Sequence, residues 1–398
     1  MQLSDFTTIE GRSFGYWALM GVLGLFVLLG AGAFLYVEIM GHGVTNMNNQ
    51  VVWGAPHVFA IALLVMASGA LNLASMATVF GASHYKQFRR FSAFLAIALL
   101  AGGLIVLLLD LGRPERLLLT MIHMNFGSMF TWNVFLYSGF MVLCFLYLWA
   151  MMEHEKWVKV AGSSAFAGRL ILTTGTGSIF GVIQAREVFH SAITAPTFIA
   201  VSLSSGTAIC LLLLMATYRQ TGREMDEKLV HGMRNMMVFF LLAVAYLMVV
   251  EKFTKSYSPA FYEVEAWIMT GPYALLYWGG VVTLGILLPL VILFNPGWSN
   301  TRGGITTAAL CAVLGEVAFV AHVLIAGQSY PLDLFPGYNI SSPFLDGQSA
   351  SYSPAAVEYM LGFGGVALAG ILYLLGIRFF RLLPDKAVAP EGWHPWSP

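Results

Sequence analysis

Long apolar runs separated by short polar segments make up almost the whole sequence. The runs lie at about 14–40, 52–80, 89–110, 128–151, 165–186, 193–218, 232–251, 269–294, 304–326 and 355–381. A helix of about 20 consecutive apolar residues spans the hydrocarbon core of a bilayer. The pattern therefore predicts an all-α polytopic membrane protein of about ten transmembrane helices, with no soluble domain.

Composition supports the same class of protein. The chain has 398 residues, of which 58% are hydrophobic and 10% are charged, and its mean hydropathy is +0.76. A soluble domain carries about 25% charged residues. The formal net charge of +0 argues against nucleic acid as a partner. We expect membrane lipids to surround most of the protein.

Positive residues set the predicted orientation. Most of the 20 Lys and Arg residues fall on the side of the two termini, and Arg169 is assigned to that side at the start of the fifth run. Cytoplasmic loops of membrane proteins are enriched in these residues. We therefore expect a multi-pass protein of the prokaryotic cytoplasmic (inner) membrane with both termini in the cytoplasm.

A weak internal repeat divides the sequence into two halves. Ala55-Pro56 matches Ala195-Pro196, Ser68-Gly69 matches Ser205-Gly206, and Asp110 matches Glu251. Four runs per unit restore the orientation, so the halves would be parallel repeats about an axis normal to the membrane. The repeat predicts four-helix bundles at 52–186 and 193–326, with a first helix at 14–51 and a last helix at 355–381. Chance resemblance between apolar helices is the alternative.

Polar residues that lie inside or beside the runs gather on the predicted outer side. They are Glu38, His42, His57, Asp110, Arg113, His123, Asn125, Glu187, His190, Glu251 and Glu358. Ionisable groups at membrane depth cost free energy and usually serve a function. We therefore expect the chemistry of this protein at its outer face.

His57 and Asp110 are the main candidates for that chemistry. His57 lies at the start of the second run, and Asp110 closes the third run at a similar depth. An imidazole and a carboxylate that face one cavity can hydrogen-bond a carbonyl or hydroxyl and exchange a proton. Quinone oxidation or reduction requires this, because each two-electron step moves two protons. The alternatives are an interface histidine and a surface pair between Asp110 and Arg113.

Glu316 is a second kind of candidate. It lies about halfway along the ninth run, with no basic neighbour in its own helix. A carboxyl group there is protonated or hydrogen-bonded to another helix. The functional interpretation is a stepping stone for protons, with His322 and Glu358 farther out. The six-residue spacing places Glu316 and His322 on different faces of a helix, so a relay between them needs water or a third group.

The cysteines and histidines limit the redox groups that this protein could hold. The three cysteines lie inside runs and form no CxxC motif, so an iron–sulfur cluster or structural zinc bound by these residues is not expected. Heme b ligated by two of His57, His123 and His190 is one alternative, although no run carries two histidines at ligand spacing. An ion or solute transporter is another, although the polar residues crowd one face instead of forming a midplane site.

Three short motifs lie along the predicted outer rim. Trp53-Gly54 opens a run, 110–113 reads DLGR, and His123-Met124-Asn125 precedes the fourth run. Together with Glu251 and the segments 261–267, 352–358 and 381–384, they resemble the NrfD/PsrC superfamily of membrane quinone-reactive subunits. The ten-run form looks most like the HybB and DsrP branch, and within it DsrP of the sulfur-metabolism complex DsrMKJOP.

The resemblance implies a quinone-binding subunit without heme that exchanges electrons with a partner. The quinone would be menaquinone or ubiquinone, and the partner a ferredoxin-like [4Fe–4S] subunit on the outer face, within a DsrMKJO-like complex. The subunit alone would not be an active enzyme. By motif position, the quinone site contains His57, Asp110, Arg113 and His123, with Glu38 and Asn125 as further candidates. Candidates for a proton pathway are Glu251, Glu316, His322 and Glu358.

Overall fold

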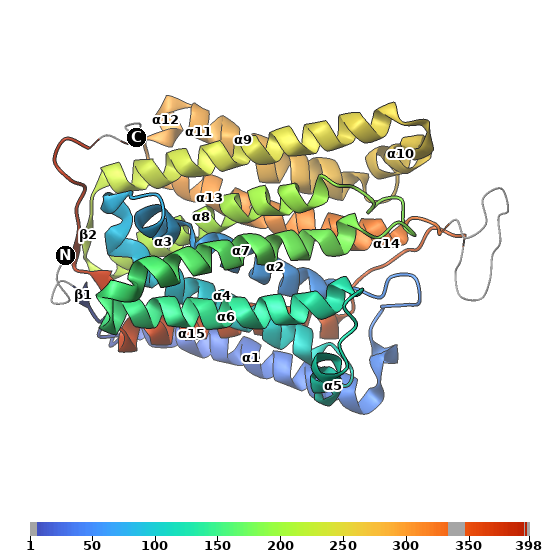
Figure 1. Cartoon of the computed structure of the whole chain (residues 1–398), viewed down its shortest axis with the longest axis horizontal. Helices are drawn as coiled ribbons and strands as arrows, with labels where there is room; N and C mark the ends of the chain where they lie inside the picture. The colour runs from blue at the N-terminus through green and yellow to red at the C-terminus, as the bar shows by residue number, and fades with distance from the viewer. Residues whose placement is uncertain (1–5, 333–346, 394, 396–398) are drawn as a thin grey trace.

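Long helices run side by side across the molecule, with short elements and loops at its two ends (Figure 1). The computed structural model describes residues 6–332, 347–393 and 395. The long helices are α1 (Phe14–Met40), α2 (Ala55–Ala70) with α3 (Asn72–Thr78), α4 (Arg89–Leu109), α6 (Met129–Glu153), α7 (Val158–Gly181), α8 (Thr194–Thr221), α9 (Glu227–Tyr257), α13 (Arg302–Ala321) and α15 (Ala356–Phe379). A π-helix, η7 (Leu276–Leu287), continues into α11 (Leu288–Phe294).

Short helical elements connect or extend the long ones. They are the 3-10 turns η2 (His42–Val44), η3 (Ser83–Phe88), η4 (Pro114–Arg116), η5 (Glu155–Trp157) and η6 (Pro259–Phe261), the π-helix η8 (His322–Ala326), and the helices α5 (Leu117–Ile122), α10 (Tyr262–Thr270), α12 (Pro296–Ser299) and α14 (Gly327–Ser329). Both termini lie at the left end of Figure 1. The opposite end, which carries α5, α10 and α14, is called the distal end below.

Nine helices in the described part of the protein are long and apolar enough to cross a membrane. This confirms the prediction of an all-α polytopic membrane protein. The remaining predicted run corresponds to α7, which has 24 residues and packs against α6 and α8. Its small polar stretch from Thr173 to Ser178 lowers its hydropathy, and small residues permit close helix packing.

The start of α7 corrects one prediction. The helix begins at Val158, so Arg169 lies near its middle and is buried, instead of lying at the cytoplasmic end of a run. Lys156 and Lys159 conceal this start in the sequence, because charged residues interrupt the apolar pattern there. The assignment of Arg169 to the cytoplasmic side was therefore wrong.

The helices pack in two groups around a central pair. In the first group α2 packs on α4 and α7, and α6 packs on α4 and α7. In the second group α8 packs on α9 and α13, and η7 with α11 packs on α9 and α13. Helix α2 contacts α8 between the groups, α15 covers α2 and α4, and α1 packs on α15. The division into two four-helix bundles stays a prediction, which this packing supports.

Glycines bring the central helices into backbone contact. A Cβ at Gly206 of α8 would collide with the backbone of Gly69 in α2, and a Cβ at Gly69 would collide with the carbonyl of Ser202. The hydroxyl of Ser202 also donates to the carbonyl of Val65, at 2.9 Å. The two Ser-Gly pairs of the predicted repeat therefore lie at one crossing point.

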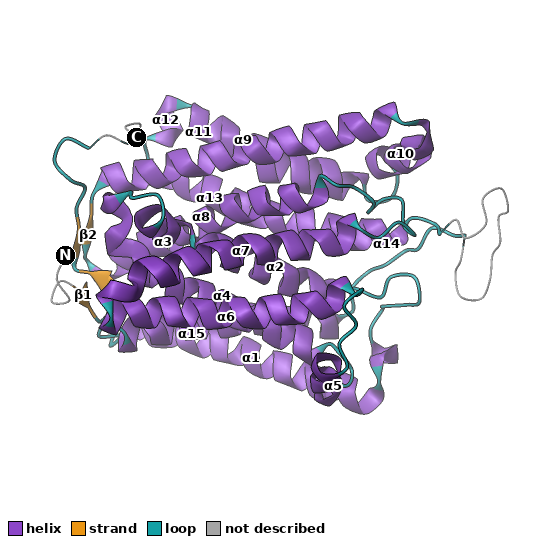
Figure 2. Cartoon of the chain, in the orientation of Figure 1, coloured by secondary structure: helices purple, strands orange, loops and turns teal. Residues whose placement is uncertain are grey.

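Two short strand pairs close the end that holds the termini (Figure 2). β1 (Phe6–Thr7) pairs antiparallel with β3 (Leu383–Pro384), and β2 (Glu224–Met225) pairs parallel with β4 (Lys386–Ala387). These pairs tie the segments before α1 and after α15 to the loop between α8 and α9. The distal end has no such tie among the described residues, and its loops are held by side chains instead.

Candidate functional site

His57 and Asp110 meet at the distal end because α2 begins where α4 ends. Pro56 occupies the first turn of α2 after the N-cap Gly54, a position where its missing N–H costs nothing. Asp110 is the C-cap of α4. Because α2 and α4 are neighbours that run in opposite directions, His57, the third residue of α2, lies beside Asp110, the C-cap of α4.

The pair is close and unequally exposed. His57 Nδ1 lies 2.8 Å from Asp110 Oδ2, with 21% of the histidine side chain and 3% of the aspartate side chain exposed. The two atoms are close but not aligned as a hydrogen bond. The imidazole is therefore open to a further partner, while the carboxylate is held inside.

His42 is a third member that the predicted site did not contain. It lies in η2, after α1, and its Nε2 is 3.2 Å from the backbone oxygen of Asp110 and 3.9 Å from Asp110 Oδ1. Its side chain is 39% exposed. Asp110 therefore lies between a partly covered histidine and a more exposed one.

Gly112 makes room for this arrangement. Its φ is +69°, a conformation that favours glycine. A Cβ at this position would also lie 2.9 Å from Cε1 of His42. The DLGR motif thus places its glycine where the backbone turns back and the His42 ring packs. His42 is 68 residues away from Asp110 in the sequence, so only its place on the outer side pointed to it.

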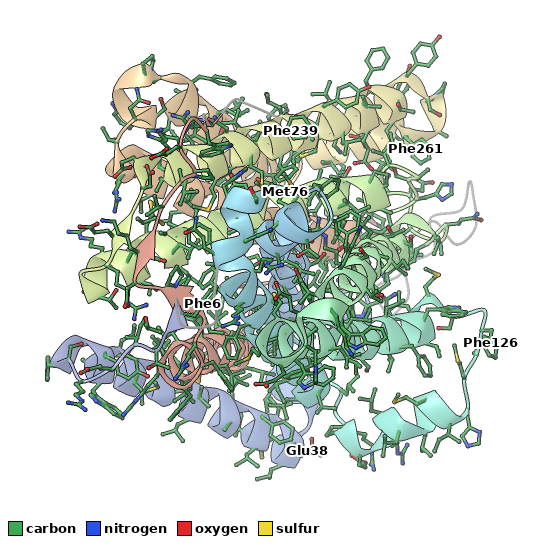
Figure 3. The ribbon with its side chains drawn as sticks, turned by 60° about the vertical axis from the view of Figure 1, so that its left-hand side comes forward. Phe6, Glu38, Met76, Phe126, Phe239 and Phe261 are labelled. Carbon is green, nitrogen blue, oxygen red and sulfur yellow. The ribbon has the colours of Figure 1, made fainter. Side chains whose placement is uncertain are left out.

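The other predicted quinone-site residues lie on the surface. Arg113 is 3.9 Å from Glu115, with 67% of its side chain exposed. His123 and Asn125 are exposed after α5, and Asn125 Oδ1 accepts from the Gly127 N–H at 2.9 Å. Figure 3 shows Glu38 at the end of α1 and Phe126 at the far edge of the molecule. Among the described residues, no hydrogen bond or ion pair joins these four predicted residues to His57 or Asp110.

Glu358 holds the start of α2. Its buried carboxylate accepts from Asn46 N–H at 3.0 Å, from Ala355 N–H at 2.9 Å, and from the hydroxyl of Tyr352. The Tyr352 oxygen in turn accepts from Ala55 N–H at 2.7 Å. Burial, followed by the bond to Glu358, raises the pKa of Tyr352, so its hydroxyl stays protonated and donates. These contacts show Glu358 as an anchor for the loop that leads to His57.

Side chains of the second group form a charged cluster at the same end. Glu251 Oε1 lies 3.9 Å from Lys255 Nζ, and Lys252 Nζ lies 2.9 Å from Glu265 Oε2. Lys252 and Lys255, with Glu251, line a hollow of about 550 Å³ that includes its open mouth. His322, the first residue of η8, also lines it and is buried. The hollow therefore gathers carboxylate, ammonium and imidazole groups.

Glu316 lies deeper in the second group. It is 3% exposed and lines a further hollow between α8, α9, η7 and α13. Met248 and Phe319 line both this hollow and the one at the charged cluster. The two hollows are therefore neighbours that share these apolar lining residues, with Glu316 in one and His322 in the other.

Arg169 occupies a comparable depth in the first group. Its guanidinium donates to the backbone oxygen of Ser68 at 3.5 Å and to Asn72 Oδ1. No carboxylate of the described residues lies within ion-pair distance of it. The first group therefore holds a fixed positive charge among neutral oxygen atoms.

Metal-ligating residues are scattered in the part of the protein that the structure describes. No group of three or more His, Cys, Asp or Glu side chains there is placed to hold a metal ion. The cysteines Cys144, Cys210 and Cys311 are buried singly, and His123 and His190 are exposed in loops.

The fold and the site define a class: an integral membrane protein of many spans with a histidine–carboxylate pair at one end. The family model described as polysulphide reductase, NrfD, matches residues 43–331. The chain therefore belongs to the NrfD family.

Relatives align over most of the sequence. An Hdr-like menaquinol oxidoreductase integral membrane subunit of Archaeoglobus fulgidus is 30% identical, over 96% of this chain and 98% of the relative. The menaquinone reductase integral membrane subunit of Nitratidesulfovibrio vulgaris is 22% identical, over 91% of this chain and 91% of the relative. Protein NrfD of Escherichia coli is 24% identical, over 70% of this chain and 96% of the relative.

Proposed function

We propose that this chain is the quinone-reactive membrane subunit of a multi-subunit oxidoreductase, with the quinone head group bound at His57 and Asp110. One observation carries the proposal: an imidazole that is 21% exposed lies 2.8 Å from a carboxylate that is 3% exposed, at the distal end where α2 begins and α4 ends. A general acid or base must lie within hydrogen-bond reach of the proton that it transfers. The exposed part of the imidazole can reach a bound quinone, while the buried carboxylate contacts the imidazole from inside the protein.

The pair supplies the proton chemistry of a two-electron reaction. When a quinol is oxidised, its two O–H bonds break, two electrons leave and two protons are released; reduction is the reverse. His57 exchanges a proton with a ring oxygen, and Asp110 orients the imidazole and stabilises its positive charge when it is protonated. His42, which is 39% exposed, connects Asp110 to water. The electrons pass to a ferredoxin-like [4Fe–4S] subunit docked at the distal end.

The remaining predicted residues have different support. Arg113, His123, Asn125 and Glu38 stay predicted contributors at the exposed rim. The position of Glu251 and His322 in one hollow and of Glu316 in a neighbouring hollow favours these three residues as a proton pathway. The contacts of Glu358 favour a structural role for it instead.

The finer identity follows from the sequence motifs and the relatives together. We propose menaquinone as the substrate, because two relatives are named for menaquinol or menaquinone. The HybB and DsrP branch, a role in sulfur-compound metabolism, and a DsrMKJO-like set of partners are proposed on the rim motifs. With both termini at one end (Figure 1), we propose an inner-membrane protein whose termini are cytoplasmic.

Quinone turnover in the purified complex tests the proposal. Asp110→Asn should lower turnover by roughly 100-fold, the scale of general acid–base catalysis, while its partner subunits still co-purify. Glu115→Gln is the matched control, since this rim carboxylate is exposed and lies 3.9 Å from Arg113 instead of beside His57. Unchanged turnover in Asp110→Asn would reject the site.

A further inference from the structure

The loop that leads into α2 is held from the second group of helices by one buried amide. Gln328 of α14 accepts the N–H groups of Val52 and Trp53 at 3.0 Å each through Oε1. Its Nε2 donates to the Trp53 oxygen at 3.0 Å and to the Leu324 oxygen at 2.9 Å. Gln328 is 1% exposed, so these backbone groups have no water to replace it.

Arg186 secures Gln328 from the loop between α7 and α8. Its guanidinium donates to the backbone oxygen of Gln328 at 2.6 Å and to that of Gln50 at 2.9 Å. Both oxygens belong to segments that converge on Trp53. The backbone from Gln50 to Trp53 is therefore held by Gln328 and Arg186.

The same loop reaches the charged cluster of the second group. Lys255 Nζ donates to the oxygen of Val188, two residues after Arg186, at 2.7 Å, and lies 3.9 Å from Glu251. A continuous set of contacts thus joins the cluster to Trp53, four residues before His57. We name Lys255, Arg186 and Gln328 the distal strap.

The other side of this loop is fixed independently. Gly54 lies between Tyr352 and the Glu358 carboxylate, and a Cβ there would collide with both. The Trp53 ring packs against α6 and α7, since its centroid lies 5.5 Å from that of Phe130 and 5.9 Å from that of Phe180. Thus α15 and the first group fix this side of the loop, and the strap holds its other side from the second group.

We infer that Gln328 and Arg186 are positioning residues for His57, and that Lys255 couples the Glu251 cluster to them. The inference rests on the proposed function only for its effect on turnover. The coupling is an interaction free energy between two sites, so it must be reciprocal, and it must appear as non-additivity between substitutions.

Chemical modification of histidines tests the positioning without using activity. In the intact complex, diethylpyrocarbonate labelling of His57 is followed by mass spectrometry, with exposed His154 as the internal standard. Gln328→Leu should raise His57 labelling about tenfold, since it leaves buried backbone donors without a partner. Gln348→Leu is the matched control, because the Gln348 side chain is exposed and Gln50 bonds to the Gln348 backbone oxygen, which the substitution keeps. Unchanged His57 labelling in Gln328→Leu would overturn the inference.

A double-mutant cycle tests the transmission. Lys255→Met should also raise His57 labelling, and should add nothing in the Gln328→Leu background. Additive effects, or no effect of Lys255→Met, would overturn the coupling to the second group.

Turnover then separates the two proposals. If Gln328 acts through His57, Gln328→Leu lowers turnover in the native complex and leaves the residual turnover of His57→Gln unchanged. A labelling change combined with full turnover in Asp110→Asn and His57→Gln would keep the strap and reject the quinone site. A general loss of folding would instead lower turnover equally in both backgrounds, and would overturn the positioning role.

Discussion

The two helix groups hold different ionisable groups at similar depth. In the first, the pair His57 and Asp110 lies at the distal end, and the guanidinium of Arg169 is buried near the middle of α7. In the second, the charged cluster lies at the distal end, and the carboxyl of Glu316 is buried within α13. A guanidinium stays charged at any physiological pH, whereas a carboxyl group can take up and release a proton. The comparison therefore favours the second group for the proposed proton pathway.

The distal ends differ in a second way. At the position that the predicted repeat matches to His57, the second group has Thr197, which lines the hollow with Glu251. The imidazole of the second group belongs to His322, at the C-terminal end of α13. The first group instead brings its imidazole and carboxylate into direct contact. The fold thus holds a closely spaced histidine–aspartate pair in one group and a charged cluster around an open hollow in the other. Substitutions can separate their roles.

Substitutions at Asp110 with its partner His57, and at Glu251, its counterpart in the predicted repeat, should give the largest difference. His57→Gln and Asp110→Asn should each lower quinone turnover by roughly 100-fold, and the double variant should lose little more, because the two act as one unit. Glu251→Gln should change turnover by less than about threefold. Steady-state kinetics of the purified complex measure all four. An equal loss in Glu251→Gln would remove the functional distinction between the groups.

The crossing of the two groups should be next in sensitivity. Gly69→Ala places a Cβ against the carbonyl of Ser202, and we expect a loss of about 3 kcal/mol in unfolding free energy from overpacking. Gly139→Ala in α6 is the control, since nothing lies within 4 Å of its Cβ position. Denaturation in detergent compares the two. Equal stability would mean that α2 and α8 separate easily.

The sequence predicted the helices and the proximity of His57 to Asp110, but not the contact of Asp110 with His42. Apolar runs identify membrane helices because the bilayer imposes a length and a composition, and His57 and Asp110 were found because each marks a helix end. His42 was missed because its contact depends on how α1 returns toward α4, which hydropathy does not encode. The hydrogen bonds of Glu358 were not predicted, because its partners Asn46 and Tyr352 are remote in sequence or in a loop.

Mid-membrane residues should affect protons more than quinone. In liposomes that contain the complex, Glu316→Gln should abolish any proton flux coupled to turnover while changing turnover by less than about threefold. Arg169→Lys, which keeps the positive charge of the first group, should leave the proton-to-electron ratio unchanged. A pH-sensitive dye inside the liposomes reports the flux. Retained flux in Glu316→Gln would show that the second group does not store the proton.

Weakening the contacts of Tyr352 and Glu358 that hold the loop before α2 should give the smallest effect. Tyr352→Phe removes one hydrogen bond to Glu358 and the acceptor for Ala55 N–H, which should cost about 1 kcal/mol of unfolding free energy near neutral pH. Burial, and then the bond to Glu358, raise the pKa of Tyr352 above its ordinary value of about 10. The folded state therefore favours the neutral hydroxyl, so its contribution is complete below pH of about 10 and is lost as the pH rises from there through the folded pKa. Unfolding measured across this range should show an alkaline loss of stability in the native protein that is smaller in Tyr352→Phe. The same alkaline loss in both proteins would mean that Tyr352 does not hold the start of α2 in its protonated form.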